Sequence, residues 1–216
     1  DAALTLKLWE IFKELLRLEN VEAIYELETS LIPILLEMRY KGVPVDLDKA
    51  EKVGKQLKKE EVNILTNIKK EHGVYPDLWA AASVATVFDR AGLSYPRSPK
   101  LNAPSFTSAW LESHDSKLAK DIGRARKLNK ARTTFIDKMI LEHSVNGRIH
   151  GELHPLRSDT GGTVTGRFSS SNPNLQQVPA RHDMIGPLVR SVFVPEKDHY
   201  WGCFDYSQQE PRLTVH

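Results

Sequence analysis

Two long stretches of helical periodicity, residues 48–72 and 117–141, occupy the middle of the chain and limit the folds open to it. Asp48 and Glu51 form a capping-box pattern at the start of the first stretch, and His72-Gly73 is a typical helix end. Apolar residues recur at helical spacing in both stretches: Val53, Leu57, Ile64 and Ile68, then Leu118, Ile122, Ala125, Leu128, Phe135 and Met139. The prolines between them predict an irregular cap with short helices at 77–91 and 105–113. We therefore expect an antiparallel helical pair.

Two further helices are predicted before this pair. Residues 1–18 and 21–40 each place a set of apolar side chains on one helical face: Leu4, Leu8, Ile11, Leu15 and Leu18, then Ile24, Leu27, Leu31, Leu35 and Met38. Pro33 either kinks the second helix or restarts it. Gly42-Val43-Pro44-Val45 then breaks the helical pattern with a short extended piece.

The pattern changes from helices to strands near residue 144. Asn146-Gly147 is a hairpin turn signal between Ser144-Val145 and residues 148–150. Residues 189–194 and 200–204 have the apolar content of short strands. Cys203 lies within the second predicted strand and is expected to be a core residue. We therefore expect an α+β fold that is mainly α, in which a long antiparallel helical domain is followed by the start of an antiparallel β domain.

Composition excludes several classes of protein. The single cysteine excludes an internal disulfide framework and a cysteine-based zinc site. No apolar run approaches the ~18 residues of a membrane helix, and the N-terminus lacks a signal-peptide pattern. The histidines show no metal-ligand spacing such as HExxH. We expect a cytoplasmic protein that has no membrane partner.

A basic face runs along the second long helix. Lys117, Lys120, Arg124 and Lys127 recur at spacings of three and four, opposite the apolar stripe. Residues 117–138 contain eight Lys or Arg against two Asp. A solvated face is the usual explanation, whereas a stripe of one sign favours contact with phosphates. The sequence leaves both interpretations open.

The last dozen residues form a candidate metal and nucleotide site. The apolar run from Tyr200 to Phe204 leads into Asp205, and a strand ending on Asp places a carboxylate at a sheet edge, where ligands bind. Ser207 is a candidate helix cap, and Pro211 fits only the first turn of that helix. With Glu210 at the helix start, the pattern suits a hard divalent cation and a sugar-phosphate substrate. The alternative is a surface turn with two solvated acids.

A second polar stretch, TGRFSSSNPNLQQVP at residues 165–179, is rich in short hydrogen-bonding side chains. Leu175 and Val178 can anchor it as an ordered loop. Together with DYSQQEPR at 205–212, it resembles the motifs TGR-x-SSS-x-PNLQ-x-x-P and DYSQ-x-E-x-R of the DNA polymerase I family (family A DNA polymerases). Gln209 and Pro211 depart from the apolar residue and the leucine usual in that family, which suggests a phage-type branch.

The resemblance covers the whole chain. Residues 1–6 resemble the last motif of the family's proofreading exonuclease, although the tyrosine that should precede Asp1 is absent. The resemblance implies three parts of the chain. They are a tail of a 3′-5′ exonuclease-like domain at 1–20, a helical thumb domain at 21–143 and the N-terminal part of a palm domain at 144–216. The family's fingers and second palm carboxylate have no match here. We therefore expect a fragment, or one part of a split enzyme with a companion chain, that is inactive alone.

The resemblance also implies roles for individual residues. Asp205 and the carbonyl of Tyr206 would ligate two Mg²⁺ ions, and Glu210 would exclude a 2′-hydroxyl from the nucleotide sugar, unless Glu210 is only a favourable helix N-terminal acid. Further nucleotide contacts would come from Tyr206, Ser207, Gln208 and Arg181. Arg167 would reach the minor groove near the primer end, or else pair with Asp159 or Asp183. Asn174, Gln176 and Gln177 would bind the duplex or brace the loop. The helical domain would hold duplex phosphates through Lys120, Arg124, Lys127, Lys130, Arg132 and Thr133.

The expected partners are primer-template DNA and deoxynucleoside triphosphates, and the expected activity is template-directed DNA synthesis. Two alternatives remain: a DNA-binding module without catalytic competence, and part of a single-subunit RNA polymerase. Glu210 argues against the second, because an enzyme that accepts ribose should not place a bulky acid against the 2′ position.

Overall fold

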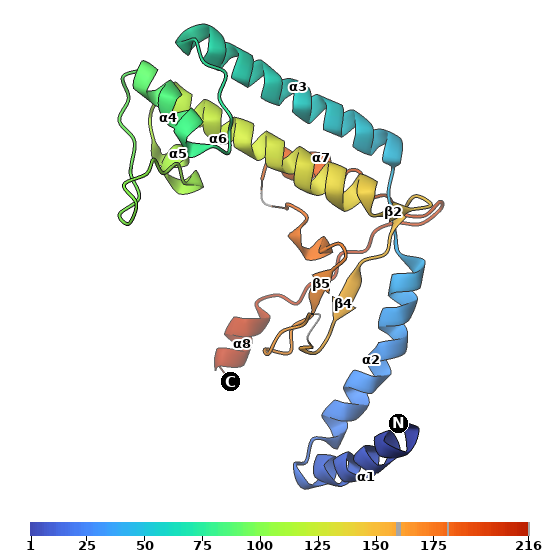
Figure 1. The fold of residues 1–216 in the computed structure, drawn as a ribbon. Helices are drawn as coiled ribbons and strands as arrows, with labels where there is room; N and C mark the ends of the chain where they lie inside the picture. Colours follow the sequence, from blue (N-terminus) through green and yellow to red (C-terminus); the bar gives the residue numbers. More distant parts are fainter. Residues whose placement is uncertain (159–160, 181, 216) are drawn as a thin grey trace.

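The computed structural model describes residues 1–158, 161–180 and 182–215. Its longest part is the predicted antiparallel pair, formed by α3 (Leu47–His72) and α6 (Lys117–Lys130), which lie side by side (Figure 1). The helix α6 continues without a break into a π-helix, η1 (Ala131–Glu142). Gly73 ends α3 in the left-handed conformation, with φ of 72°.

The start of α3 corrects the predicted capping box. Asp46, not Asp48, caps the helix, because its side chain accepts a hydrogen bond from the backbone N–H of Lys49 at 2.9 Å. The helix therefore begins at Leu47. Val45, just before the cap, is held in an extended bridge to Phe193, which fixes where the helical conformation can start.

The core lies along the inner faces of the pair, in two clusters. One surrounds Phe88 and joins the far ends of α3 and α6 to the cap. The other joins the start of α3 to η1, with Leu57, Leu128 and Ile136 fully buried. Each such side chain contributes about 1.5–3 kcal/mol to folding. Phe135 is only partly buried at the edge of the second cluster.

The cap between the two long helices contains α4 (Ala81–Arg90) and α5 (Ser108–Ser113), both shorter than predicted. Thr107 caps α5 by accepting from the backbone N–H of Trp110 at 3.2 Å. Arg126 of α6 ties this region down by donating to the carbonyls of Leu78 at 2.7 Å and Phe106 at 2.5 Å. Burial lowers the pKa of Arg126, and these carbonyls replace part of its lost hydration.

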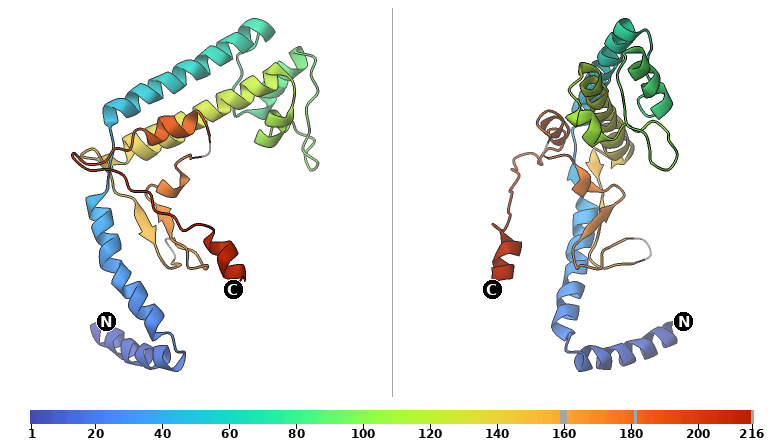
Figure 2. Two further views of the ribbon diagram at one scale, coloured as in Figure 1. Left: turned by 180° about the vertical axis from the view of Figure 1, so that it is seen from behind. Right: turned by 90° about the vertical axis from the view of Figure 1, so that its left-hand side faces the viewer.

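The N-terminal helices, α1 (Ala2–Leu18) and α2 (Glu22–Lys41), extend away from the pair (Figure 2). The helix α2 continues through Pro33 and does not restart there. No residue of either helix is buried, so both predicted apolar faces are largely open. None of the described helices is long and apolar enough to cross a membrane.

Short antiparallel strands connect these helices. The strand β3 (Arg148–Ile149) lies between β1 (Val43–Pro44) and β2 (Ser144–Val145). Asn146 and Gly147 have φ of 51° and 74°, which confirms the predicted hairpin turn. A second sheet pairs β4 (Glu152–His154) with β5 (Ser169–Ser171). The remaining elements are the 3₁₀-helix η2 (Leu175–Gln177), α7 (Ile185–Arg190) and α8 (Gln209–Val215).

The α+β class, mainly α, is therefore confirmed, but two predicted strands are wrong. Residues 185–190 form α7, and only Phe193 forms a strand-like bridge. Val189 and Val192 are buried at helical spacing rather than by alternation. Residues 200–204 pair with no strand in the described chain, so Cys203 is exposed and not in a core. An apolar run becomes a strand only where a partner edge is available.

Candidate functional site

Residues 165–179, here called the motif loop, are held by their own short polar side chains. The Ser170 hydroxyl accepts from the backbone N–H of Leu175 at 3.3 Å and donates to the carbonyl of Pro173 at 3.4 Å. Gly166 has φ of 72°, a conformation that glycine adopts readily, and it precedes an exposed Arg167. The loop is therefore ordered, as its composition predicts.

Two of the three candidate amides brace this loop. The Asn174 side chain accepts from the backbone N–H of Gln176 at 3.0 Å and caps η2. The Gln176 side chain donates to the carbonyl of Phe168 at 3.0 Å. Gln177 is exposed. The structure thus favours bracing for Asn174 and Gln176 and leaves Gln177 accessible.

The C-terminal motif is an exposed extended segment followed by α8. Asp205 is exposed, and Tyr206 is 81% exposed. The helix begins at Gln209, so the residue directly before it is Gln208 and not the predicted cap Ser207. Gln208 has φ of 53° and its carbonyl accepts from the N–H of Arg212 at 3.0 Å. Pro211 lies in the first turn, as predicted.

An ion pair brings the two motifs together. The guanidinium of Arg167 donates to the carboxylate of Glu210, and both side chains are 75% exposed. Asp183 is therefore not the partner of Arg167 in the described chain, while Asp159 and the candidate nucleotide contact Arg181 lie outside the described residues. Glu210 does lie in the first turn of α8, where the helix dipole favours an acid.

The donors at this motif suit magnesium in type. A carboxylate from Asp205 and a backbone carbonyl from Tyr206 are oxygen ligands, which Mg²⁺ prefers. Among the described residues no three acids, histidines or cysteines converge as a metal site. Glu210 is engaged by Arg167, which leaves Asp205 as the free carboxylate of the motif.

The basic face of α6 is largely neutralised by acids from neighbouring elements. Lys117 pairs with Glu71 at 2.5 Å, and Arg124 pairs with Glu60 at 3.3 Å, both across the helical pair. Lys127 pairs with Glu112 of α5 at 2.7 Å. Sequence periodicity missed these acids because they lie on other helices. The sequence did contain a signal for this acidic face. Glu60 and Glu71 are eleven residues apart, which is about three helical turns, so both lie on the same face of α3.

The local electrostatics follow from these pairs. The hydrogen bond from Lys117 lowers the pKa of Glu71, and the one from Lys127 lowers the pKa of Glu112. Within the part of the chain that the structure describes, Lys120 and Lys130 have no acid within ion-pairing distance, and both are exposed. They are the candidate phosphate contacts that remain available.

Arg132 and Thr133 are half-buried at the start of η1. Arg132 lies 2.7 Å from Asp137 and 3.8 Å from Glu61, and the Thr133 hydroxyl donates to the carbonyl of Asn129 at 2.9 Å. The Thr133 hydroxyl and the terminal nitrogens of Arg132 are thus already used within the helical pair, whereas Arg132 Nε is buried without a hydrogen-bond partner among the described residues. Any contact with DNA would have to share or replace these partners.

A polar network around the buried carboxylate of Glu61 lies beside them. Asn129 donates to Glu61 at 2.8 Å and accepts from the indole N–H of Trp79 at 3.0 Å. Glu61 is only 8% exposed, although it is an acid in the middle of α3. The network joins α3, the cap and the end of α6 at one place.

Comparison with known proteins assigns this arrangement to a class. Residues 47–216 match the sequence profile of DNA polymerase family A. A DNA-directed DNA polymerase of Pseudomonas phage M6 is 36% identical over 92% of this chain and 31% of the relative. DNA polymerase I of Synechocystis sp. is 34% identical over 92% of this chain and 20% of that protein.

A solved structure shares the fold. The POL domain of Pol1 from M. smegmatis, in complex with DNA primer-template and dNTP, superposes with a TM-score of 0.61. It is 23% identical, and the match covers 77% of this chain and 29% of that one.

The fold and the two motifs therefore define a nucleic-acid polymerase architecture. The chain belongs to the family A DNA polymerases. Phage proteins named DNA polymerase DpoZ are also among its relatives, at 31% identity for the Acinetobacter phage SH-Ab 15497 protein, which the match covers to 36%. The chain spans about a third of the length of these phage relatives.

Proposed function

We propose that this chain takes part in template-directed DNA synthesis, with residues 21–143 as the thumb and 144–216 as the first part of the palm. Family membership supports the DNA polymerase hypothesis over a single-subunit RNA polymerase. The observation that carries the proposal is the Arg167–Glu210 pair, because it joins the two family motifs in one place. Primer-template DNA and deoxynucleoside triphosphates are the proposed partners.

Each motif has a distinct task in this proposal. Arg167 contacts the minor groove of the primer end, where every base pair offers an acceptor. Asp205 holds magnesium through its carboxylate, with the Tyr206 carbonyl beside it. Magnesium, when bound, would neutralise charge on the reacting phosphates. The segment 206–210 faces the incoming nucleotide, and Glu210 limits the space at its sugar.

The Arg167–Glu210 pair occupies one terminal nitrogen of the guanidinium and the carboxylate of Glu210, so it competes with both tasks. Arg167 cannot donate the same N–H groups to Glu210 and to a base edge. Because both side chains are largely exposed, opening the pair costs little free energy. We therefore propose that primer-template binding releases Glu210 for its contact with the sugar.

Residues 1–216 are proposed to be inactive alone. Two-metal phosphoryl transfer needs acidic ligands on both sides of the two metal ions. Asp205 by itself cannot hold both metal ions at the required separation. The test is primer extension with magnesium, comparing residues 1–216 with a longer polypeptide that adds the family's fingers and second palm carboxylate. Extension by the longer protein alone is the expected result. Nucleotide incorporation by highly purified 1–216 would overturn this part of the proposal.

A further inference from the structure

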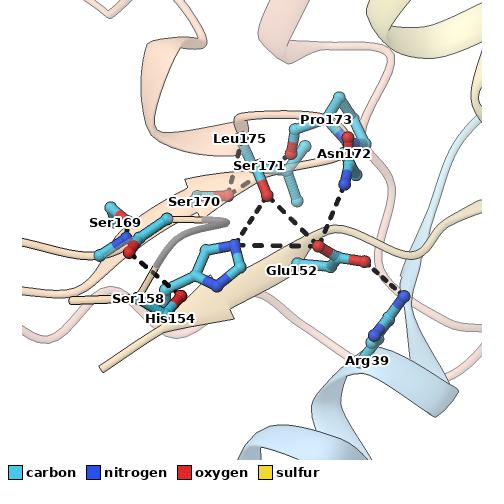
Figure 3. A network of polar contacts seen from close by, with 12 residues as sticks. Arg39, Glu152, His154, Ser158, Ser169, Ser170, Ser171, Asn172, Pro173 and Leu175 are labelled. Atoms are coloured by element: carbon cyan, nitrogen blue, oxygen red, sulfur yellow. Dashed lines mark hydrogen bonds and ion pairs between the residues drawn. The ribbon is translucent and has the colours of Figure 1, made fainter. Parts of the chain in front are cut away.

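The carboxylate of Glu152, in β4, lies between helix α2 and the motif loop (Figure 3). Its Oε1 accepts from the Arg39 guanidinium at 2.5 Å. Its Oε2 accepts from Ser171 Oγ at 3.3 Å and from Asn172 Nδ2 at 3.1 Å. The Glu152 side chain is 22% exposed, so these contacts replace most of its hydration. One carboxylate thus connects two segments that are more than a hundred residues apart.

The Ser171 hydroxyl is fixed from both sides. It lies 2.7 Å from His154 Nε2, and Glu152 lies 3.8 Å from the same nitrogen. A hydroxyl has one hydrogen, and Ser171 donates it to Glu152. With that hydrogen directed at Glu152, the short contact to His154 has the imidazole Nε2–H as its donor. The resulting chain of donors runs from His154 through Ser171 to Glu152.

The end of α2 is held by three residues at alternate positions of one segment, namely Arg148, His150 and Glu152. Arg148 donates to the carbonyl of Lys41 at 2.5 Å, and His150 Nδ1 donates to the carbonyl of Arg39 at 2.8 Å. Residues two apart in an extended segment face the same side. These donors satisfy helix-end carbonyls that would otherwise lack partners. The end of α2 is consequently fixed relative to β4.

The other side of Glu152 faces the part of the motif loop that leads into η2. Ser171 and Asn172 directly precede the PNLQQ residues 173–177, the last three of which form η2. Further on, Leu175 is partly buried against the second core cluster, and its N–H donates to Ser170 Oγ at 3.3 Å. The position of η2 relative to the helices therefore depends on where Ser171 and Asn172 are held as well as on the packing of Leu175.

We propose that Glu152 is a positioning residue that couples helix α2 to the motif loop. Arg39 holds one oxygen of the carboxylate, and the other oxygen fixes Ser171 and Asn172. The coupling sets the place of residues 173–177 against bound duplex. The part of this inference that concerns DNA rests on the proposed function, whereas the coupling itself can be measured without DNA.

Charge reversal tests the coupling. The variants are Glu152→Arg, Arg39→Glu and the double variant, with Glu51→Gln as a matched control from the exposed Lys55–Glu51 pair on α3. The first readout is amide hydrogen exchange at Leu175 and Gln176 without DNA, and the second is affinity for a primed duplex by fluorescence anisotropy. Thermal unfolding verifies that each variant remains folded.

Each single variant is expected to lower amide protection at Leu175 and Gln176 by about tenfold. In Glu152→Arg the loop loses two hydrogen bonds, and in Arg39→Glu the new carboxylate repels Glu152 from the place where it holds the loop. Duplex affinity is expected to fall by about fivefold. The double variant should return both to within about threefold, since hydroxyl and amide groups of Ser171 and Asn172 can accept from an arginine as well as donate to a carboxylate.

The outcomes separate this inference from the proposed function. Unchanged amide exchange in Glu152→Arg, or a double variant no better than the single ones, would overturn the coupling. Lack of duplex binding by the unmodified chain would instead overturn the proposed function, and the exchange measurement would still decide whether Glu152 holds the loop.

Discussion

Arg167 and Glu210 form an ion pair that links the TGR motif to the first turn of α8. Arg167 is proposed to contact the minor groove at the primer end, and Glu210 is proposed to limit the space at the nucleotide sugar. The ion pair thus links the residues of two different contacts. Each neutralises the other in this structure, and each is proposed to release the other when its ligand arrives.

The first prediction concerns this pair. Arg167→Ala and Glu210→Ala should each leave the unfolding midpoint nearly unchanged, because exposed ion pairs contribute little to stability. Arg167→Ala should weaken binding of primed duplex severalfold, whereas Glu210→Ala should leave it equal or tighter, since Arg167 is then free. Thermal unfolding and fluorescence anisotropy provide the two measurements. A similar loss of duplex affinity in both variants would show that the pair acts as a fixed unit.

The second prediction separates catalysis from binding in a polymerase that contains this sequence and extends primers. Asp205→Ala should abolish extension and leave primer-template affinity nearly intact, because metal-held phosphates matter chiefly in the transition state. Glu210→Ala should retain part of the DNA activity and accept ribonucleotides more readily. The measurement is the ratio of incorporation efficiency for a deoxynucleotide and its ribonucleotide. An unchanged ratio in Glu210→Ala would place the sugar gate at another residue.

The third prediction concerns the basic face of α6. The isolated chain should bind primed duplex weakly, with log K falling against log salt at a slope of roughly −2 to −4, for about two to four phosphate contacts. The variant with both Lys120→Glu and Lys130→Glu should flatten the slope. Lys117→Glu, a control at a lysine already paired with Glu71, should change it less. Equal effects of the two changes would mean that the ion pairs do not limit which lysines reach DNA.

The fourth prediction concerns the buried network. Asn129→Ala should destabilise the chain by about 2 kcal/mol, because the buried Glu61 carboxylate loses its hydrogen bond from Asn129. Gln56→Ala, which removes an exposed bond to Glu60, should cost less than about 0.5 kcal/mol. Urea unfolding of both variants gives the comparison, and equal costs would contradict the importance assigned to burial.

The fifth prediction concerns pH. Partial burial raises the pKa of Asp121 above its usual 3.8, against the opposing effect of Lys117. A carboxyl with a raised folded pKa binds a proton more readily when folded, so its contribution to stability falls as pH rises through that pKa. Asp121→Asn should therefore be more stable than the unmodified chain at pH 7, and the difference should shrink at about pH 3. Asp115→Asn, at an exposed aspartate before α6, serves as the control in the same urea titrations.

Local signals in the sequence predict most of the elements. The periodicity of α3 and α6 and the Asn146-Gly147 turn depend on neighbours within a few residues, and the structure has them as predicted. The strand at 200–204 failed because its formation depends on a partner edge far away in the chain. The cap of α3 shifted to Asp46 because a distant contact, from Val45 to Phe193, sets where the helix starts.

The candidate site shows the same division. The motif residues can be found in the sequence, and Asn174 and Gln176 brace their loop through bonds to residues close by. The partners of Arg124 and of Arg167 come from other elements, at Glu60 and Glu210, and no periodicity within one helix reveals them. Charge patterns therefore locate a basic face, but they do not reveal whether its side chains are already paired with acids from other elements.

The pairing of β1 with β3 places Val43 opposite Ile149 and Pro44 opposite Arg148. Ser144 of β2 also lies opposite Ile149. Residues 45–143 therefore leave the sheet after β1 and return to it at β2, so the helical pair is a topological insert closed at its base. Such a closed cassette keeps its two ends together by strand register as well as by its own core. Exchanging it between related chains would not lengthen or shorten the path of the surrounding backbone, but the exchange would have to preserve Val189 and Val192, which share the buried cluster at its base.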